Sequence, residues 1–145
     1  MKKVLLALSV AAMLAFAATA SASSPSAYRA QVNGICAVGV KQLNAIPKPT
    51  KPSDYYAYFK AGATMGDKLL AKIASVNPPS SLKSQVATAV SRQGAFEAGL
   101  HALVSKLKTS SNPKQTVNAA AAKLNSLNAK ANAAWRAAGL KKCAA

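Results

Sequence analysis

The side chains that could do acid–base or metal chemistry are few. Glu97 and His101 stand four residues apart, and no other acid lies near enough in the sequence to act with the single histidine. On a helix this spacing places both side chains on one face, where a general base or half of a metal site could be built. Both residues flank the apolar stripe Phe96, Leu100 and Leu103, with no third ligand or nucleophile in view. We therefore interpret them as an ordinary surface pair and predict that the protein is not an enzyme, with no catalytic residue.

Cofactor and metal sites are not expected either. A carboxylate-bridged metal pair inside a helical bundle requires several inward Glu residues and Glu-x-x-His motifs, whereas the whole chain has three acids. Covalent haem requires Cys-x-x-Cys-His, which the sequence lacks. Noncovalent haem would need two axial ligands, and Met65 and His101 are the candidates. If the helices on either side of Pro78 are antiparallel, residues equally distant from Pro78 lie side by side. Met65 lies 13 residues before Pro78 and His101 lies 23 residues after it, so the two side chains are too far apart along the helices to bind one iron. We predict no cofactor and no metal.

The charge balance indicates the class of partner. Among 145 residues there are 19 Lys and Arg against three acids, giving a net charge of +16, and 51% of the residues are hydrophobic. So high an apolar content argues against a disordered basic tail, which lacks the side chains needed to offset its ordering entropy. A folded basic body attracts anions. The leading hypothesis is thus a non-enzymatic protein that binds an anionic polymer of the cell envelope or an acidic protein.

A cluster of aromatic residues accompanies some of these charges. Four aromatic side chains fall within the five residues from Tyr55 to Phe59. Exposed tyrosines beside lysines can bind an anionic polymer or stack on rings. Equally, Tyr55 and Phe59 could be core, with Tyr56 and Tyr58 covering a helix end and the lysines only keeping the protein soluble. The polyanion site predicted at this end consists of Lys48, Lys51, Tyr56, Tyr58, Lys106, Lys108 and Lys114.

The first residues have the pattern of a secretory signal peptide. Lys2 and Lys3 precede an apolar run over residues 4–17, and small residues at 18–22 offer cleavage sites. The run is shorter than the ~20 residues that span a bilayer, and no second such run follows. We expect residues 1–22 to be removed, leaving residues 23–145 as a single domain without a transmembrane segment. The expected location is secreted, periplasmic or at the cell envelope.

Export would favour pairing of the two cysteines, Cys36 and Cys143. In the chain-entropy model, closing a loop of about 100 residues stabilises the fold by ~4.7 kcal/mol. A reactive or metal-binding pair of thiols is the alternative, although no Cys-x-x-Cys spacing or histidine partner supports it.

Proline-containing breaks at residues 46–53, 77–80 and 110–113 divide the remainder into four segments, each with helical periodicity. The stripe of the third segment is Leu82, Val86, Ala89, Gln93, Phe96, Leu100, Leu103 and Leu107. Short connections favour antiparallel neighbours, so we predict an all-α fold, an up-down-up-down four-helix bundle closed by one disulfide. The first and fourth helices are expected to be neighbours joined by that bond. This requires that the tail after Gly139 fold back, or that the first helix start later than Ser26.

Glycine pairs occur within three of the segments, for example Gly62 and Gly66. They could open a cavity for a small apolar ligand, which makes an exported carrier the alternative function. We favour the interpretation that these glycines allow close contact between helices where no side chain fits.

Three short motifs carry a resemblance to a known group of proteins. They are Gly34-Ile35-Cys36, Pro78-Pro79-Ser80-Ser81-Leu82 and the closing stretch from Trp135 to Cys143. With them the chain resembles small exported actinobacterial-type helical proteins with two cysteines. The resemblance implies a secreted, disulfide-closed helical bundle and carries over no activity. The strong basicity of this chain departs from the group, which puts any shared ligand in doubt.

Overall fold

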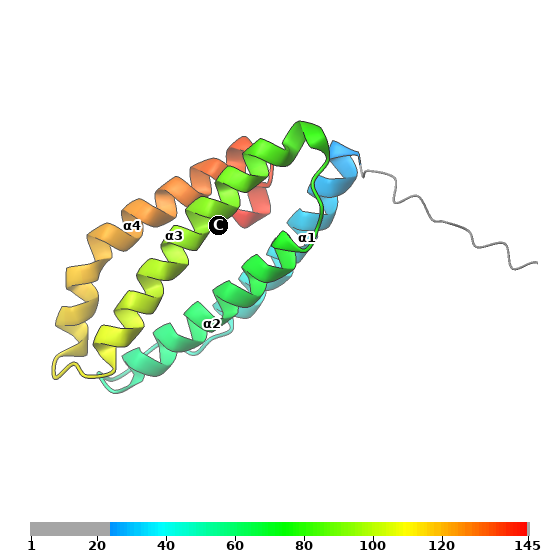
Figure 1. Cartoon of the computed structure of the whole chain (residues 1–145). Coiled ribbons are helices and arrows are strands. Elements are labelled where there is room, and N and C mark those ends of the chain that lie inside the picture. Colours follow the sequence, from blue (N-terminus) through cyan, green and yellow to red (C-terminus); the bar gives the residue numbers. More distant parts are fainter. Residues whose placement is uncertain (1–23, 145) are drawn as a thin grey trace, which may run out of the picture.

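The computed structural model describes residues 24–144, and every regular element in this range is helical (Figure 1). The four α-helices are α1 (Pro25–Asn44), α2 (Asp54–Ala74), α3 (Lys83–Leu107) and α4 (Pro113–Ala137). Two single turns of 3₁₀-helix accompany them, η1 (Ser80–Leu82) and η2 (Lys141–Cys143). The predicted all-α class is confirmed. The expected signal peptide, residues 1–22, lies outside the described residues.

Local sequence signals set where these helices begin and end. Ser24 caps α1 by accepting a hydrogen bond from the backbone N–H of Ala27 at 3.2 Å, and Asn112 caps α4 in the same way toward Gln115. A proline follows each cap, at a position where the missing N–H costs no helical hydrogen bond. After α4, Gly139 adopts a φ of 76°, a left-handed conformation that glycine reaches without strain. The chain therefore reverses there.

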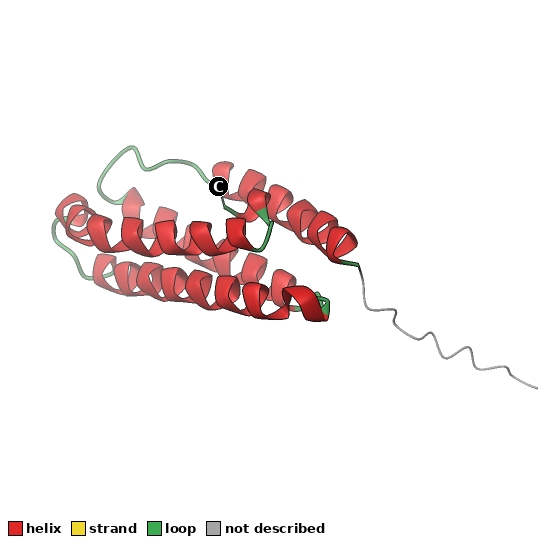
Figure 2. Ribbon diagram, turned by 90° about the horizontal axis from the view of Figure 1, so that it is seen from above, coloured by secondary structure: helices red, strands yellow, loops and turns green. Residues whose placement is uncertain are grey.

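The helices pack in sequence order: α1 on α2, α2 on α3, and α3 on α4 over the largest contact. The connecting loops lie at the ends of the helices (Figure 2). The expectation that α1 and α4 are neighbours is wrong, because no extended contact joins them. Instead the turn η2 packs against both. The side of the molecule between α1 and α4 is thus covered by the C-terminal tail over only part of its length.

Cys36 and Cys143 form a disulfide, as predicted, with their Cα atoms 5.0 Å apart. The bond joins α1 to the folded-back tail, so it does not connect the first and last helices directly. Arg29 Nε donates to the carbonyl of Ala138 at 2.9 Å, and the backbone N–H of Lys142 donates to Asn33 Oδ1 at 2.9 Å. The predicted folding back after Gly139 is confirmed, since α1 already begins at Pro25.

Most of the hydrophobic core gathers at the disulfide end. Trp135 and Tyr28 are the largest fully buried side chains, and Leu140 of the C-terminal tail is fully buried as well. The other members of this cluster are Val32, Cys36, Ile73, Leu82, Val86, Ala89, Ala138 and Ala144. Within residues 24–144, no helix is long and apolar enough to cross a membrane.

Candidate functional site

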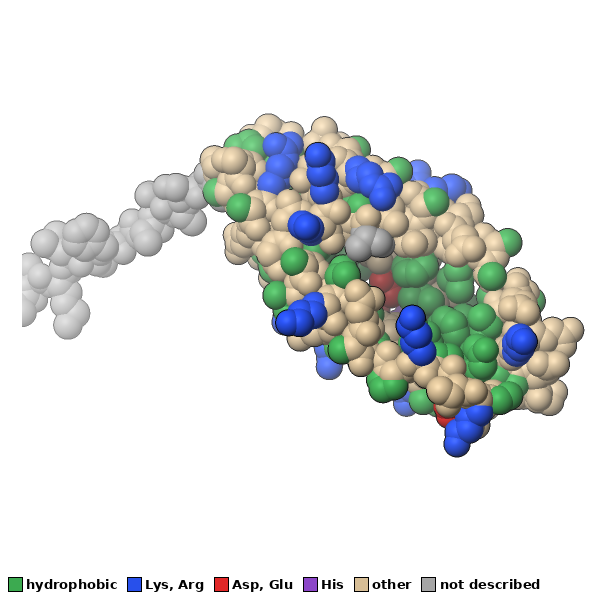
Figure 3. Space-filling view, turned by 180° about the vertical axis from the view of Figure 1, so that it is seen from behind, with side chains coloured by type: hydrophobic (Ala, Val, Ile, Leu, Met, Phe, Trp, Pro, Cys, Tyr) green, Lys and Arg blue, Asp and Glu red, His purple; other side chains and the backbone are tan. Residues whose placement is uncertain are grey.

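A pocket of about 480 Å³ opens between the helices beyond this core. Residues of all four helices and of η2 line it, and Figure 3 shows its mouth, with apolar side chains in the hollow and an acidic side chain inside. Small-molecule sites typically enclose about 300–1,000 Å³. The size therefore suits a small organic ligand.

The pocket exists because α1 is shorter than the other helices and because α4 presents polar residues where it borders the pocket. α1 ends at Asn44, and residues 45–53 lead to the start of α2. From the opposite side α4 presents Asn128 and Asn132 to the pocket, where a closed bundle would place larger apolar residues. Consequently the core that fills the disulfide end does not continue here.

Four aromatic side chains line the pocket: Tyr58, Phe59, Phe96 and Trp135. The rings of Tyr58 and Phe59 meet edge to face, with their centroids 5.2 Å apart. Leucine and isoleucine side chains of α1 and α2 complete much of the wall. The walls therefore favour an apolar or aromatic body.

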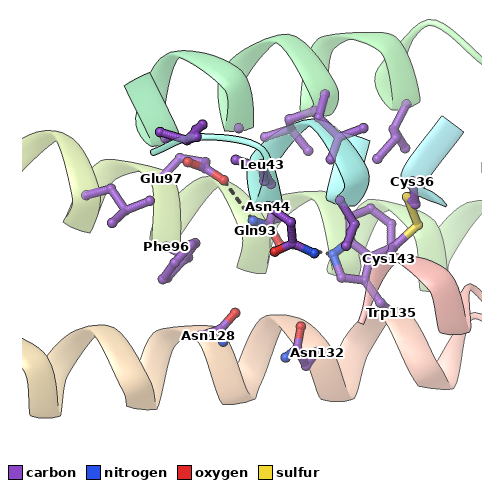
Figure 4. A pocket seen from close by; sticks show the side chains of 18 of the residues that line it. Cys36, Leu43, Asn44, Gln93, Phe96, Glu97, Asn128, Asn132, Trp135 and Cys143 are labelled. Atoms are coloured by element: carbon purple, nitrogen blue, oxygen red, sulfur yellow. Dashed lines mark hydrogen bonds between the residues drawn. A yellow bond between two sulfur atoms is a disulfide. The ribbon is translucent and has the colours of Figure 1, made fainter. Parts of the chain in front are cut away.

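One carboxyl group lies within these apolar walls. Glu97 is 5% exposed, and its Oε1 accepts a hydrogen bond from Gln93 Nε2 at 2.8 Å. Gln93 Oε1 in turn accepts from the indole N–H of Trp135 at 3.1 Å (Figure 4). Glu97 Oε2 is buried and has no hydrogen-bond partner among the described residues. The chain of hydrogen bonds from Trp135 thus fixes the carboxyl group and leaves one of its oxygens free.

The surroundings of Glu97 raise the pKa of its carboxyl. Burial, which penalises the charged form, is the largest cause. The hydrogen bond from Gln93 lowers the pKa, the charge of Asp67 raises it, and His101 lowers it, without reversing the effect of burial. Glu97 therefore titrates closer to neutrality than an exposed glutamate.

Gly66 makes room for this carboxyl group. A Cβ atom on Gly66 would overlap the carboxyl atoms of Glu97, so any other residue there would displace it. At Gly62, one turn earlier and also at the pocket, a Cβ would meet open space. Close contact does explain Gly39, whose Cβ would overlap the side chain of Leu69. The favoured interpretation of the glycines, close contact where no side chain fits, therefore holds for Gly39 and Gly66 and is wrong for Gly62, which faces open space at the pocket.

The prediction that Glu97 and His101 form a surface pair is also wrong. Glu97 points between the helices, whereas His101 is about half-exposed and its Nε2 lies 2.9 Å from Oδ2 of Asp67 on α2. Sequence reasoning placed Glu97 beside the apolar stripe and missed its burial. The signal that could have revealed it is Gly66, because a residue without a side chain on the facing helix leaves space for a large one. In the described part of the chain, no group of three His, Cys, Asp or Glu residues could hold a metal ion.

The residues of the predicted polyanion site are divided between two surroundings. All five lysines are exposed, near the start of α2 and the turn between α3 and α4, which share one end of the molecule (Figure 1). Tyr56 is half-buried beside Lys60, whose Nζ lies 5.6 Å from the ring centre. Tyr58 lines the pocket. The aromatic and basic residues thus do not form one continuous exposed surface, and polyanion binding by Lys48, Lys51, Lys106, Lys108 and Lys114 stays a prediction.

Comparisons with known proteins add no relative to this description. No protein-family model matches the chain, no curated protein matches its sequence, and no solved structure matches its fold.

Proposed function

We propose that this protein is a non-enzymatic carrier that binds a small molecule with an apolar body in the pocket between its helices. The observation that carries the proposal is the pocket of about 480 Å³, lined by four aromatic rings and one buried carboxyl group. In this proposal the helices form an up-down-up-down bundle, and the protein is exported and acts outside the cytoplasm.

The cost of such a cavity supports a ligand-binding role. Protein interiors are ordinarily packed as densely as organic crystals, and unfilled space forfeits packing energy. Here the sequence keeps Gly62 at the pocket, although glycine inside a helix costs about 1 kcal/mol relative to alanine. The unfilled space and the glycine therefore each lower the stability of the protein. A ligand that fills the pocket would offset this loss.

Gly62→Leu tests the proposal directly. The new side chain enters open space at the pocket, so we expect it to fill the site while preserving the fold. Binding of Nile red, a neutral apolar dye whose fluorescence rises on burial, should weaken at least tenfold. Gly34→Leu is the matched control, because Gly34 also faces open space within a helix but does not line the pocket. Equal dye binding by both variants, or none by the unmodified protein, would contradict a carrier function.

Binding of an anionic polymer is the second candidate function. The observation that favours it is the exposure of Lys48, Lys51, Lys106, Lys108 and Lys114 near one end of the molecule. A polymer there would not need the pocket, so the two functions are separable by mutation.

A further inference from the structure

We propose that the ligand of this pocket is an amphiphilic amine, whose protonated amino group is received by Glu97 while its apolar body lies among the aromatic rings. The inference rests on the proposed carrier function and names the chemical class of its ligand.

The hydrogen-bonding state of Glu97 indicates what the ligand must supply. Buried polar atoms in proteins nearly always have a partner. Oε2 of Glu97 has none within residues 24–144, while Oε1 accepts a hydrogen bond from Gln93. A carboxylate oxygen accepts hydrogen bonds, so the missing partner is a donor. An ammonium group supplies a donor and a neutralising charge together.

The distribution of charge in the protein favours a cation over an anion. None of the lysines and arginines of the described residues lines the pocket, although bases outnumber acids 19 to three in the chain. One of the three acids lies there instead. A pocket for an anionic ligand in so basic a protein would be expected to use the abundant cationic side chains. Their exclusion leaves Glu97 as the charged group of the lining.

The remaining lining groups suit the same ligand. Aromatic faces attract cations as well as apolar groups, and Tyr58, Phe59, Phe96 and Trp135 provide them. Asn44, Asn128 and Asn132 add amide oxygens that can accept further N–H groups of an amine.

Proton binding by Glu97 should control the affinity. The other titratable groups near its carboxyl are Asp67 on α2 and His101 on α3, which pair with each other, while α1 and α4 present uncharged amides. Burial raises the pKa of Glu97, so acidification protonates it and removes the charge that attracts an amine. Amine affinity should therefore fall as the pH drops through the pKa of Glu97.

Three probes of matched shape test the inference: phenylbutylamine, phenylbutanol and phenylbutyrate. In calorimetry at neutral pH, the amine should bind about ten to a hundred times more tightly than the alcohol, because hydrogen bonds to charged groups are the stronger ones. Phenylbutyrate should bind more weakly than the alcohol. In the unmodified protein the preference for the amine should decrease on acidification, while affinity for the alcohol stays nearly constant.

Glu97→Gln keeps the shape of the side chain and removes its charge, so it should abolish the preference for the amine while still binding the alcohol. Asp67→Asn is the matched control: it removes the neighbouring, half-exposed charge outside the pocket and should keep the preference. Equal affinity for amine and alcohol in the unmodified protein would overturn the amine assignment and leave the carrier function standing. A preference for phenylbutyrate would mean that a protonated Glu97 donates to the ligand, which also overturns it. Failure to bind any of the probes or Nile red would remove both proposals.

Discussion

The two ends of the molecule are built from the same helices but differ in how completely they are packed. At the closed end, around Tyr28, Cys36, Trp135 and Leu140, the C-terminal tail fills the space between α1 and α4. Toward the open end, where α2 begins and α3 turns into α4, α1 comes to its end, and its last two turns line the pocket. Trp135 belongs to both regions, since it is core on one side and pocket wall on the other.

The difference shows how a small protein can hold a cavity without losing its fold. The closed end concentrates the buried aromatic area and the covalent link, which stabilise the whole chain. The open end contributes less to the core and can therefore accept a buried carboxyl and glycine residues that cost stability. The core cluster and most of the proposed binding pocket thus lie toward different ends of the same helices.

Removing the disulfide should lower the stability of the protein more than any of the substitutions that follow. Replacing both Cys36 and Cys143 by Ser should lower the free energy of unfolding by about 4 kcal/mol, since the bond links residues 107 apart in the sequence. Urea denaturation of the variant beside the unmodified protein measures the change. A loss below about 1 kcal/mol would show that the closed end does not depend on its covalent link.

Two alanine substitutions one helical turn apart should act in opposite directions. Gly66→Ala places a methyl group on the carboxyl of Glu97 and should destabilise the protein by about 1–2 kcal/mol through overpacking. Gly62→Ala meets open space and should stabilise it by about 1 kcal/mol through helix propensity. Thermal unfolding of both variants measures the contrast. Changes of the same sign would mean that the two glycines do not have the different surroundings described above.

The pH dependence of stability should report the burial of Glu97. Its pKa is raised above the ordinary value of 4.5, so the folded state holds this proton more tightly than the unfolded state. The resulting stability is fully present below pH 4.5 and is lost as the pH rises through the pKa of the folded state. Glu97→Gln should therefore exceed the unmodified protein in stability by about 1 kcal/mol at neutral pH and match it in acid. Parallel stability curves for the two proteins would contradict this.

The lysines near the open end should affect folding least. Changing Lys106, Lys108 and Lys114 to Gln should alter the free energy of unfolding by less than about 0.5 kcal/mol, because all three are exposed. If that end binds polyanions, the same change should reduce the salt dependence of heparin binding by up to about three counterions. Lys83, Lys141 and Lys142, toward the closed end, are the matched set. Equal losses from both sets would show that only net charge matters.

The fold could be predicted from sequence where local signals act alone. Helical periodicity, the cap at Asn112 and the reversal at Gly139 depend on neighbouring residues, and each is found as expected. The disulfide was predictable from the expected compartment and the even cysteine count. The contact between α1 and α4 was mispredicted because it depends on where the folded tail comes to lie, and η2 occupies that place.

The pocket was less predictable than the fold, for a physical reason. Periodicity placed Glu97 at the border of an apolar stripe, where a small rotation of the helix decides between solvent and interior. That rotation depends on the space that the facing helix offers to the side chain. Here α2 offers space because Gly66 has no side chain. Tyr58 posed the same difficulty, since its spacing suited both an exposed ring and the pocket wall that it forms.

The bond between Cys36 and Cys143 also makes a covalent ring of nearly the whole described chain, including the loops at residues 45–53 and 108–112. A single protease cut in either loop leaves both fragments attached to each other through the sulfur atoms. The nicked molecule would run as one species on a gel until it is reduced, and its helices would stay at high effective concentration. In surroundings rich in proteases, the fold and its pocket could thus outlast the continuity of the backbone.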